Sequence, residues 1–319
     1  MGRTGGYPVV GFDGTNHLVV WEDDANSPNN DVYGQFISSA GQLAGGQLPL
    51  CTQTENQYSP SVCFGRTHYL VAWPSRRRGS PELYDIEGCL VSRSGTPGGI
   101  VRISQTASPS YNPASLAFDG TNFTVVWNRD IGPGDPSPTE WDVYGRLVSE
   151  AGSPLGNELA MATGAGSQTL PTIGFDGLNY LVSWHDELEM NTKFRFFRPS
   201  GLPVGEEFHV FAPVGLQVPL GLITCFDGNR FLAIADLNED WSRVPYGDVW
   251  GAFIPKSAPV ELTVTPNLVT NDYVGKVTLT ITGLSPGETV RIGQHADLNH
   301  NGAFDPGEPL LQAFGAPET

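Results

Sequence analysis

A ten-residue pattern returns along this chain at intervals of about fifty residues. Its first copy, Phe12 to Trp21, reads FDGTNHLVVW. Close copies run from Phe118 to Trp127 and from Phe175 to Trp184, and looser copies run from Phe64 to Trp73 and from Phe226 to Ala235. Successive copies begin 52, 54, 57 and 51 residues apart. A period of this length is typical of β-propeller blades or of a solenoid.

Each copy has the same internal order of strands and turns. A short strand follows a proline, which fits the first residue of a strand because no ladder donor is needed there. An Asp-Gly turn leads into a continuous apolar run, which predicts a strand covered on both faces. A third strand reads Asp-Val-Tyr-Gly or a variant of it, and a Gly-marked turn leads to a fourth strand. Four antiparallel strands per unit predict an all-β fold, a β-propeller over residues 1–255.

Some details of the unit leave alternatives open. A β-solenoid is the rival architecture, although its repeats are usually shorter. Copy two has Gly65-Arg66 in place of Asp-Gly, and copy four reads Thr192-Lys193-Phe194 at its third strand. Copy five has no clear fourth strand before Pro255, and few residues precede copy one. We therefore expect five blades that close imperfectly, or a longer chain with more blades.

The residue before each repeated Phe is small. The five copies carry Gly11, Cys63, Ala117, Gly174 and Cys225 there. We expect these positions to be buried, because first strands crowd around the axis of a propeller. The irregular spacing of the four cysteines predicts neither a disulfide framework nor a zinc site.

The repeats resemble a family of bacterial extracellular propeller repeats, with units like FDGTNYLVVW followed by DIYGQ and a Gly turn. The resemblance covers residues 7–254 and implies a propeller fold and an exported setting. It implies no particular activity, because such repeats accompany many functions. We therefore expect a secreted or cell-surface protein whose chain is part of a larger multidomain protein.

The charge balance excludes one class of partner. Lys and Arg total 17 against 34 for Asp and Glu, a formal net charge of −17. An acidic surface repels phosphate backbones, so we expect no nucleic-acid partner. We also expect no membrane insertion, because no apolar run approaches the ~20 residues of a spanning helix.

The pattern changes after Pro255. Residues 256–319 contain alternating apolar and polar stretches that predict part of an immunoglobulin-like β domain. Residues 297–308 match the twelve-residue calcium loop, D-x-[DN]-x-[DN]-G-x5-E. Calcium is the predicted cofactor, and its ligands would be Asp297, Asn299, Asn301, Ala303 through its carbonyl, Asp305 and Glu308. The flanks read as strands, so the loop is expected to brace the domain and not to act as a sensor.

Carboxylates gather after the repeated tryptophan, where the loops of one rim begin. The acids singled out there are Asp23, Asp130 and Asp186, and the aromatic residues beside the same loops are Trp141, Trp241 and Tyr246. No catalytic sequence motif is present, and the first strands carry no acid near the axis. We therefore expect a non-catalytic binding or scaffold module that holds a carbohydrate or a protein on this rim. The alternatives are a propeller-type glycoside hydrolase that uses the rim acids and a purely structural spacer.

Overall fold

The computed structural model describes residues 5–24, 29–80, 82–109, 112–130, 140–211, 218–238, 248–257, 261–265, 278–282, 291–295 and 310–315. Regular structure in these ranges consists of β-strands. They contain no helix long and apolar enough to cross a membrane. The chain divides into two compact units, and the main boundary between them falls after Ser257.

The large unit contains five antiparallel sheets, one for each copy of the repeat. Sheet 1 holds β1 (Gly5–Phe12), β2 (Asn16–Asp23), β3 (Asp31–Ser38) and β4 (Leu43–Cys51). Sheet 2 holds β5 (Ser61–Phe64), β6 (His68–Arg76), β7 (Tyr84–Ser92) and β8 (Val101–Arg102). Sheet 3 holds β9 (Ser115–Phe118), β10 (Asn122–Asp130), β11 (Trp141–Ser149) and β12 (Pro154–Ala162).

Sheet 4 holds β13 (Gln168–Phe175), β14 (Tyr180–Asp186), β15 (Asn191–Phe197) and β16 (Pro203–Phe208). Sheet 5 has three described strands, β17 (Val218–Phe226), β18 (Arg230–Asn238) and β19 (Asp248–Pro255). In the small unit, β20 (Glu261–Thr265) pairs with β21 (Thr278–Thr282). A second hairpin joins β22 (Arg291–His295) to β23 (Leu310–Gly315).

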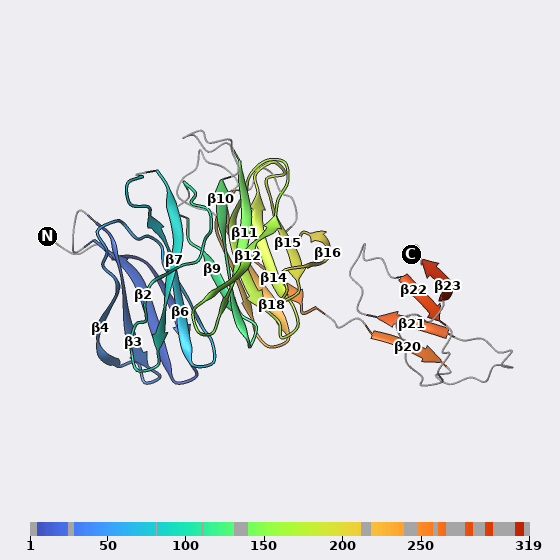
Figure 1. The fold of residues 1–319 in the computed structure, drawn as a ribbon, viewed down its shortest axis with the longest axis horizontal. Coiled ribbons are helices and arrows are strands. Elements are labelled where there is room, and N and C mark those ends of the chain that lie inside the picture. Colours follow the sequence, from blue (N-terminus) through green and yellow to red (C-terminus); the bar gives the residue numbers. More distant parts are fainter. Residues whose placement is uncertain are drawn as a thin grey trace. The chain divides into compact units, whose positions relative to one another are not determined.

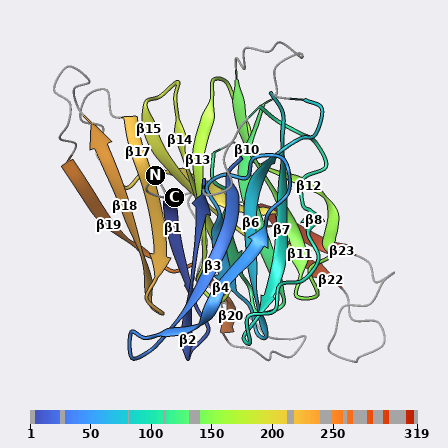
Figure 2. The ribbon, with the colours of Figure 1, turned by 90° about the vertical axis from the view of Figure 1, so that its left-hand side faces the viewer.

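The five sheets follow one another in chain order, from blue to orange (Figure 1). Their first strands lie side by side, β1 against β5, β5 against β9, β9 against β13 and β13 against β17. The second view shows the sheets fanned out around these strands (Figure 2). This arrangement is a β-propeller, so the predicted fold class is confirmed.

Apolar layers between neighbouring sheets form the core. Four buried clusters join sheet 1 to 2, 2 to 3, 3 to 4 and 4 to 5. Each layer takes aromatic residues from the second strand of the later sheet. Those fully buried there include Trp73, Trp127, Trp184, Tyr69, Phe123, Tyr180 and Phe231. The continuous apolar runs of the sequence are therefore explained, because each inner sheet has a neighbour on both faces.

The Asp-Gly turns have the geometry that their sequence predicts. Asp13 Oδ1 accepts hydrogen bonds from the backbone N–H groups of Thr15 (2.8 Å) and Asn16 (2.7 Å). Gly14 follows with φ 89°, a conformation that a side chain would disfavour. The same carboxylate contacts recur at Asp119, Asp176 and Asp227.

The second copy lacks this Asp, and a residue from another sheet replaces it. Glu150, in the turn before β12, accepts hydrogen bonds from the N–H groups of Arg66 (2.8 Å) and Thr67 (3.0 Å). A carboxylate therefore still caps the turn, although it comes from sheet 3.

The small residues before each Phe have a different role from the one expected. A Cβ atom at Gly11 would lie 3.2 Å from the ring of Tyr69, and one at Gly174 would lie 2.9 Å from the ring of Phe231. These positions are small because an aromatic ring of the next sheet lies against them. The expectation that Cys225 is buried was wrong, because no described later sheet covers it and the residue is exposed.

Candidate functional site

The structure places the described residues that were predicted for the rim on four different strands. Asp23, Asp130 and Asp186 lie at the ends of β2, β10 and β14, and Trp141 is the first residue of β11. The remaining candidates lie outside the described residues. They are the aromatic residues Trp241 and Tyr246 and the calcium-loop residues Asp297, Asn299, Asn301, Ala303, Asp305 and Glu308.

Two of the three rim aspartates take part in the sheets themselves. Asp23 is buried, and its Oδ2 lies 3.4 Å from the indole Nε1 of Trp21, which donates to it. The backbone N–H of Asp130 donates to Ser108 Oγ at 2.9 Å. Neither residue lines a pocket described below, whereas Asp186 does.

Asp186 begins a tight turn at the end of β14. Its Oδ1 accepts the backbone N–H groups of Leu188 (3.0 Å) and Glu189 (2.9 Å). Asp commonly holds turns in this way, because its short side chain reaches the backbone two and three residues ahead. In this turn, Asp186 Oδ2 and the Glu189 side chain both lie against Lys193 of β15.

Lys193 comes from β15, opposite the repeated tryptophan. It pairs across the strands with Trp184, as Glu87 pairs with Trp73 and Tyr144 with Trp127. The position next to the tryptophan therefore varies between sheets. Only sheet 4 places a lysine there, and its side chain is only 12% exposed.

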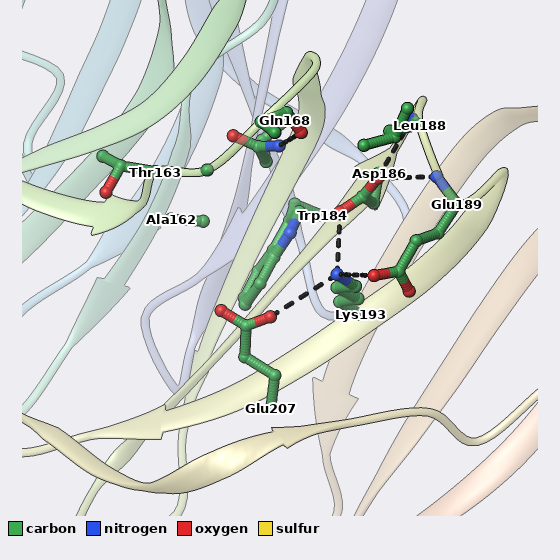
Figure 3. A pocket seen from close by; sticks show the side chains of 11 residues that line it. Ala162, Thr163, Gln168, Trp184, Asp186, Leu188, Glu189, Lys193 and Glu207 are labelled. Atoms are coloured by element: carbon green, nitrogen blue, oxygen red, sulfur yellow. Dashed lines mark hydrogen bonds and ion pairs between the residues drawn. The ribbon is translucent and has the colours of Figure 1, made fainter.

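Three carboxylates surround the Lys193 ammonium group (Figure 3). Nζ lies 2.8 Å from Asp186 Oδ2, 2.8 Å from Glu189 Oε1 and 3.6 Å from Glu207 Oε2. Glu207 comes from β16, so the second, third and fourth strands and the turn between the second and third all contribute. Arg195 lies 4.0 Å from the other oxygen of Glu207, so the three acids outnumber the two permanent cations beside them.

The cluster lines a small pocket between the end of β12 and sheet 4. Its volume is about 150 Å³. Trp184 and Gln168 form part of the wall, together with the segment Ala162 to Ala165 (Figure 3). Asn128 of sheet 3 fixes this wall, because its Nδ2 donates to the Gln168 carbonyl at 2.7 Å.

The contacts keep Asp186 and Lys193 charged. Burial by itself favours the neutral acid, but hydrogen bonds from Lys193 and from two backbone N–H groups outweigh it and lower the pKa of Asp186. Burial also opposes the charge of Lys193, yet the carboxylates of Asp186 and Glu189 raise its pKa above the ordinary value. The pair is therefore an ionised contact, largely withdrawn from water.

The separation of the acids is bounded by their common partner. The Asp186 and Glu189 oxygens can be no more than twice 2.8 Å apart, and Glu207 can be no farther from Asp186 than contacts of 2.8 and 3.6 Å allow. Carboxyl groups lie about 5–5.5 Å apart in retaining glycosidases and about 6.5–9.5 Å apart in inverting ones. The three carboxyl groups are therefore close enough to act on one glycosidic bond.

A second pocket, of about 470 Å³, lies between the end of sheet 1 and sheet 2. Its Asp85 accepts two hydrogen bonds from Arg77 (3.0 and 2.8 Å) and pairs with Arg102 at 2.8 Å. Asp85 also occupies the aspartate position that recurs in the third strands. Burial raises the pKa of the neighbouring Glu87, although Ser75 opposes the shift. Because Arg76, Arg77 and Arg78 line this pocket beside Glu55, Asp85 and Glu87, its acids do not outnumber its cations.

Lys193, Glu189 and Glu207 were not among the residues predicted from the sequence. The signal for Lys193 was present, because copy four departs from Asp-Val-Tyr-Gly at that point. A repeat that abandons its pattern at one position indicates a local role. Glu189 and Glu207 carry no such signal, because turns and fourth strands vary in every copy.

Comparison with models of protein families gives no match, and comparison with characterised proteins gives none either. Solved structures with a similar fold include carbohydrate-cleaving enzymes. One is the GH93 α-L-arabinofuranosidase of Fusarium graminearum, solved with arabinobiose. It is 10% identical, with a TM-score of 0.51 over 75% of this chain and 72% of that chain.

Two GH43 enzymes are also similar. One, a β-xylosidase/α-arabinofuranosidase from a compost metagenome, is 11% identical, with a TM-score of 0.46 over 89% of this chain and 95% of that chain. The other, from Xanthomonas citri, is 14% identical, with a TM-score of 0.41 over 72% of this chain and 82% of that chain. At 10% identity and a TM-score of 0.51, the likeness to the GH93 enzyme shows a shared fold.

The comparison corrects the expected function. A non-catalytic binding or scaffold module was the main expectation, and the absence of acids from the first strands was its main support. The fold is shared with a solved glycoside hydrolase, the GH93 enzyme, so the expectation of a non-enzymatic module was wrong. The enzymatic alternative agrees better with this neighbour.

Proposed function

We propose that the protein is a glycoside hydrolase whose active site is the acidic pocket of sheet 4. The observation that carries the proposal is the group of three carboxylates within 3.6 Å of one ammonium nitrogen. Glycosidases cleave through an oxocarbenium-like transition state with two carboxyl groups. An excess of negative charge in a partly enclosed pocket stabilises such a cation.

The contacts suggest a role for each acid. Asp186 is the nucleophile, because it is held ionised and lines the pocket. Its oxygen bonds to the anomeric carbon while the glycosidic bond breaks, and Glu207 gives its proton to the leaving oxygen. Water then releases the sugar, with Glu207 taking the proton back. Lys193 positions the carboxylates.

The size of the pocket indicates the mode of attack. A volume near 150 Å³ is below the ~300–1,000 Å³ of pockets for drug-sized ligands, so it suits one sugar ring. The enzyme would then remove terminal sugars. Arabinobiose is the first substrate to test, because it is bound to the solved arabinofuranosidase that shares the fold.

The proposed cellular location is the one that the repeats imply. We propose an exported bacterial protein whose C-terminal unit is braced by calcium at residues 297–308. Millimolar calcium outside cells is sufficient for modules that bind at about 0.1–1 mM.

The test is turnover by the full chain. Arabinobiose and a panel of nitrophenyl glycosides, including α-L-arabinofuranoside and β-D-xyloside, would be incubated with the wild type, and released sugar would be measured. Asp186→Asn and Glu207→Gln should each lower kcat at least ~100-fold, as expected for loss of a nucleophile or an acid.

Glu206→Gln is the matched control. Glu206 precedes Glu207 on β16, and neighbouring side chains on a strand point to opposite faces. This variant should keep wild-type kcat. The proposal fails if no glycoside in the panel is cleaved, or if activity survives both substitutions in the pocket.

A further inference from the structure

The junctions between neighbouring sheets are built from two repeated contacts. In the first, an aromatic ring of the later sheet lies against the small residue of the earlier one, as Tyr69 does on Gly11 and Phe231 on Gly174. Because the same contact recurs at different junctions, each sheet has a face that presents the small residue and a face that presents the ring.

The second contact is a hydrogen bond to the start of the later sheet. Glu22 Oε2 accepts the N–H of Ser59 at 2.7 Å, and Asn128 Oδ1 accepts the N–H of Leu170 at 3.2 Å. Ser59 and Leu170 have φ values of 38° and 52°, and each precedes a proline. Such conformations persist where surrounding contacts impose them.

In sheet 1, the face that corresponds to the ring-bearing face of the later sheets has no described sheet packed against it. Tyr7, which precedes Pro8, has φ 51° and so repeats the conformation of Ser59 and Leu170. Its side chain is 67% exposed, and Val10 and Phe12 on the same strand are 59% and 50% exposed. His17 takes the place of the buried rings and is only half-buried.

Sheet 5 presents the complementary face. The small residue is the exposed Cys225, and the apolar side chains Ile223, Val249 and Phe253 are 62%, 74% and 56% exposed. Asp236 holds the strand position of Glu22 and Asn128, since each pairs with a valine of its third strand. Asp236 is therefore an acid at the strand position from which Glu22 and Asn128 accept a hydrogen bond from the next sheet.

We propose that sheet 5 of one molecule docks on sheet 1 of a second copy, head to tail. Each chain carries both halves of such a junction, and four apolar layers already join its described sheets in sequence. Both faces are exposed in the same molecule, so they do not cover each other. Exposed apolar patches of this kind mark interaction surfaces, and two different patches that fit each other give a heterologous contact.

Mixing two variants of the full chain tests this arrangement. Sedimentation should show wild-type self-association, and Val10→Asp or Ile223→Asp should each weaken it at least ~30-fold, as for a buried interface residue. A one-to-one mixture of the two variants should form dimers and nothing larger, because each variant keeps one intact face.

Leu202→Asp is the control, because Leu202 is 59% exposed in the turn before β16, away from both faces. It should associate like the wild type. Circular dichroism should show that all variants are folded. A monomeric wild type overturns the proposal, as does a mixture of the two variants that stays monomeric. Self-association of either variant at wild-type strength also overturns it.

Discussion

Lys193 Nζ lies 2.8 Å from Asp186 Oδ2, and this ion pair joins the third strand of sheet 4 to the end of its second. The contact is shielded, since the two side chains are 12% and 7% exposed. It holds one acid of the cluster ionised and brings Glu189 and Glu207 to the same nitrogen. The stability of sheet 4 and the charge of the proposed active site therefore depend on one lysine.

Replacing Lys193 should destabilise the protein strongly. Lys193→Met leaves Asp186 buried without its cation, and removing one partner of a buried pair costs roughly 3–5 kcal/mol. Urea unfolding would measure the loss. Lys256→Met removes an exposed lysine and should change the free energy of unfolding little. Adding Asp186→Asn to Lys193→Met should recover part of the loss, and no recovery would argue against the pair.

The stability contributed by Asp186 should depend on pH in the acid range. Its pKa is lowered in the folded state, so its contribution is present above the ordinary Asp value of ~3.9 and is lost as pH falls through the lowered value. The difference in melting temperature between wild type and Asp186→Asn should therefore be largest above about pH 4 and shrink at lower pH. A difference that stays constant from pH 7 to pH 2.5 would contradict this.

Adding one methyl group at Gly174 should weaken the junction of sheets 4 and 5. The new Cβ would lie 2.9 Å from Phe231 Cε1, so Gly174→Ala should cost about 1–3 kcal/mol through overpacking. Gly46→Ala is the control, because nothing lies within 4 Å of a Cβ there. Phe231→Leu in the same chain as Gly174→Ala should restore part of the stability if the clash is the cause.

Calcium binding by residues 297–308 can be measured directly in solution. Titration calorimetry of the full chain should detect one site with a Kd of roughly 0.1–1 mM. Asp297→Ala and Glu308→Ala should abolish the heat, because they remove the ligands at loop positions 1 and 12. Asp272→Asn, outside the loop, should bind like the wild type. No heat from the wild type would remove the site.

The fold was predictable because its determinants are local and repeated. A proline and a continuous apolar run specify the start and the burial of the first two strands in every copy, and an Asp-Gly turn specifies the hairpin in four of the five. Glu150 shows a contact that local sequence patterns cannot predict. It caps the turn of sheet 2 from sheet 3, and no local pattern links residues 84 positions apart.

The candidate site was predictable only in part. Asp186 follows the repeated tryptophan and was singled out for that reason, together with Asp23 and Asp130. Those two do not line the pocket, and the three residues that join Asp186 lie on a turn and two other strands. Their meeting depends on strand register and on the path of the turn after Asp186, which composition does not reveal.

The sequence by itself determined that this protein is a series of repeated antiparallel β units, because the period and the apolar runs recur in each copy. Only the tertiary structure decided which acids share one cation and which faces stay uncovered. The physical reason is that burial and electrostatic coupling depend on distances between strands. Those distances are set by how whole sheets pack, and not by the order of residues within one sheet.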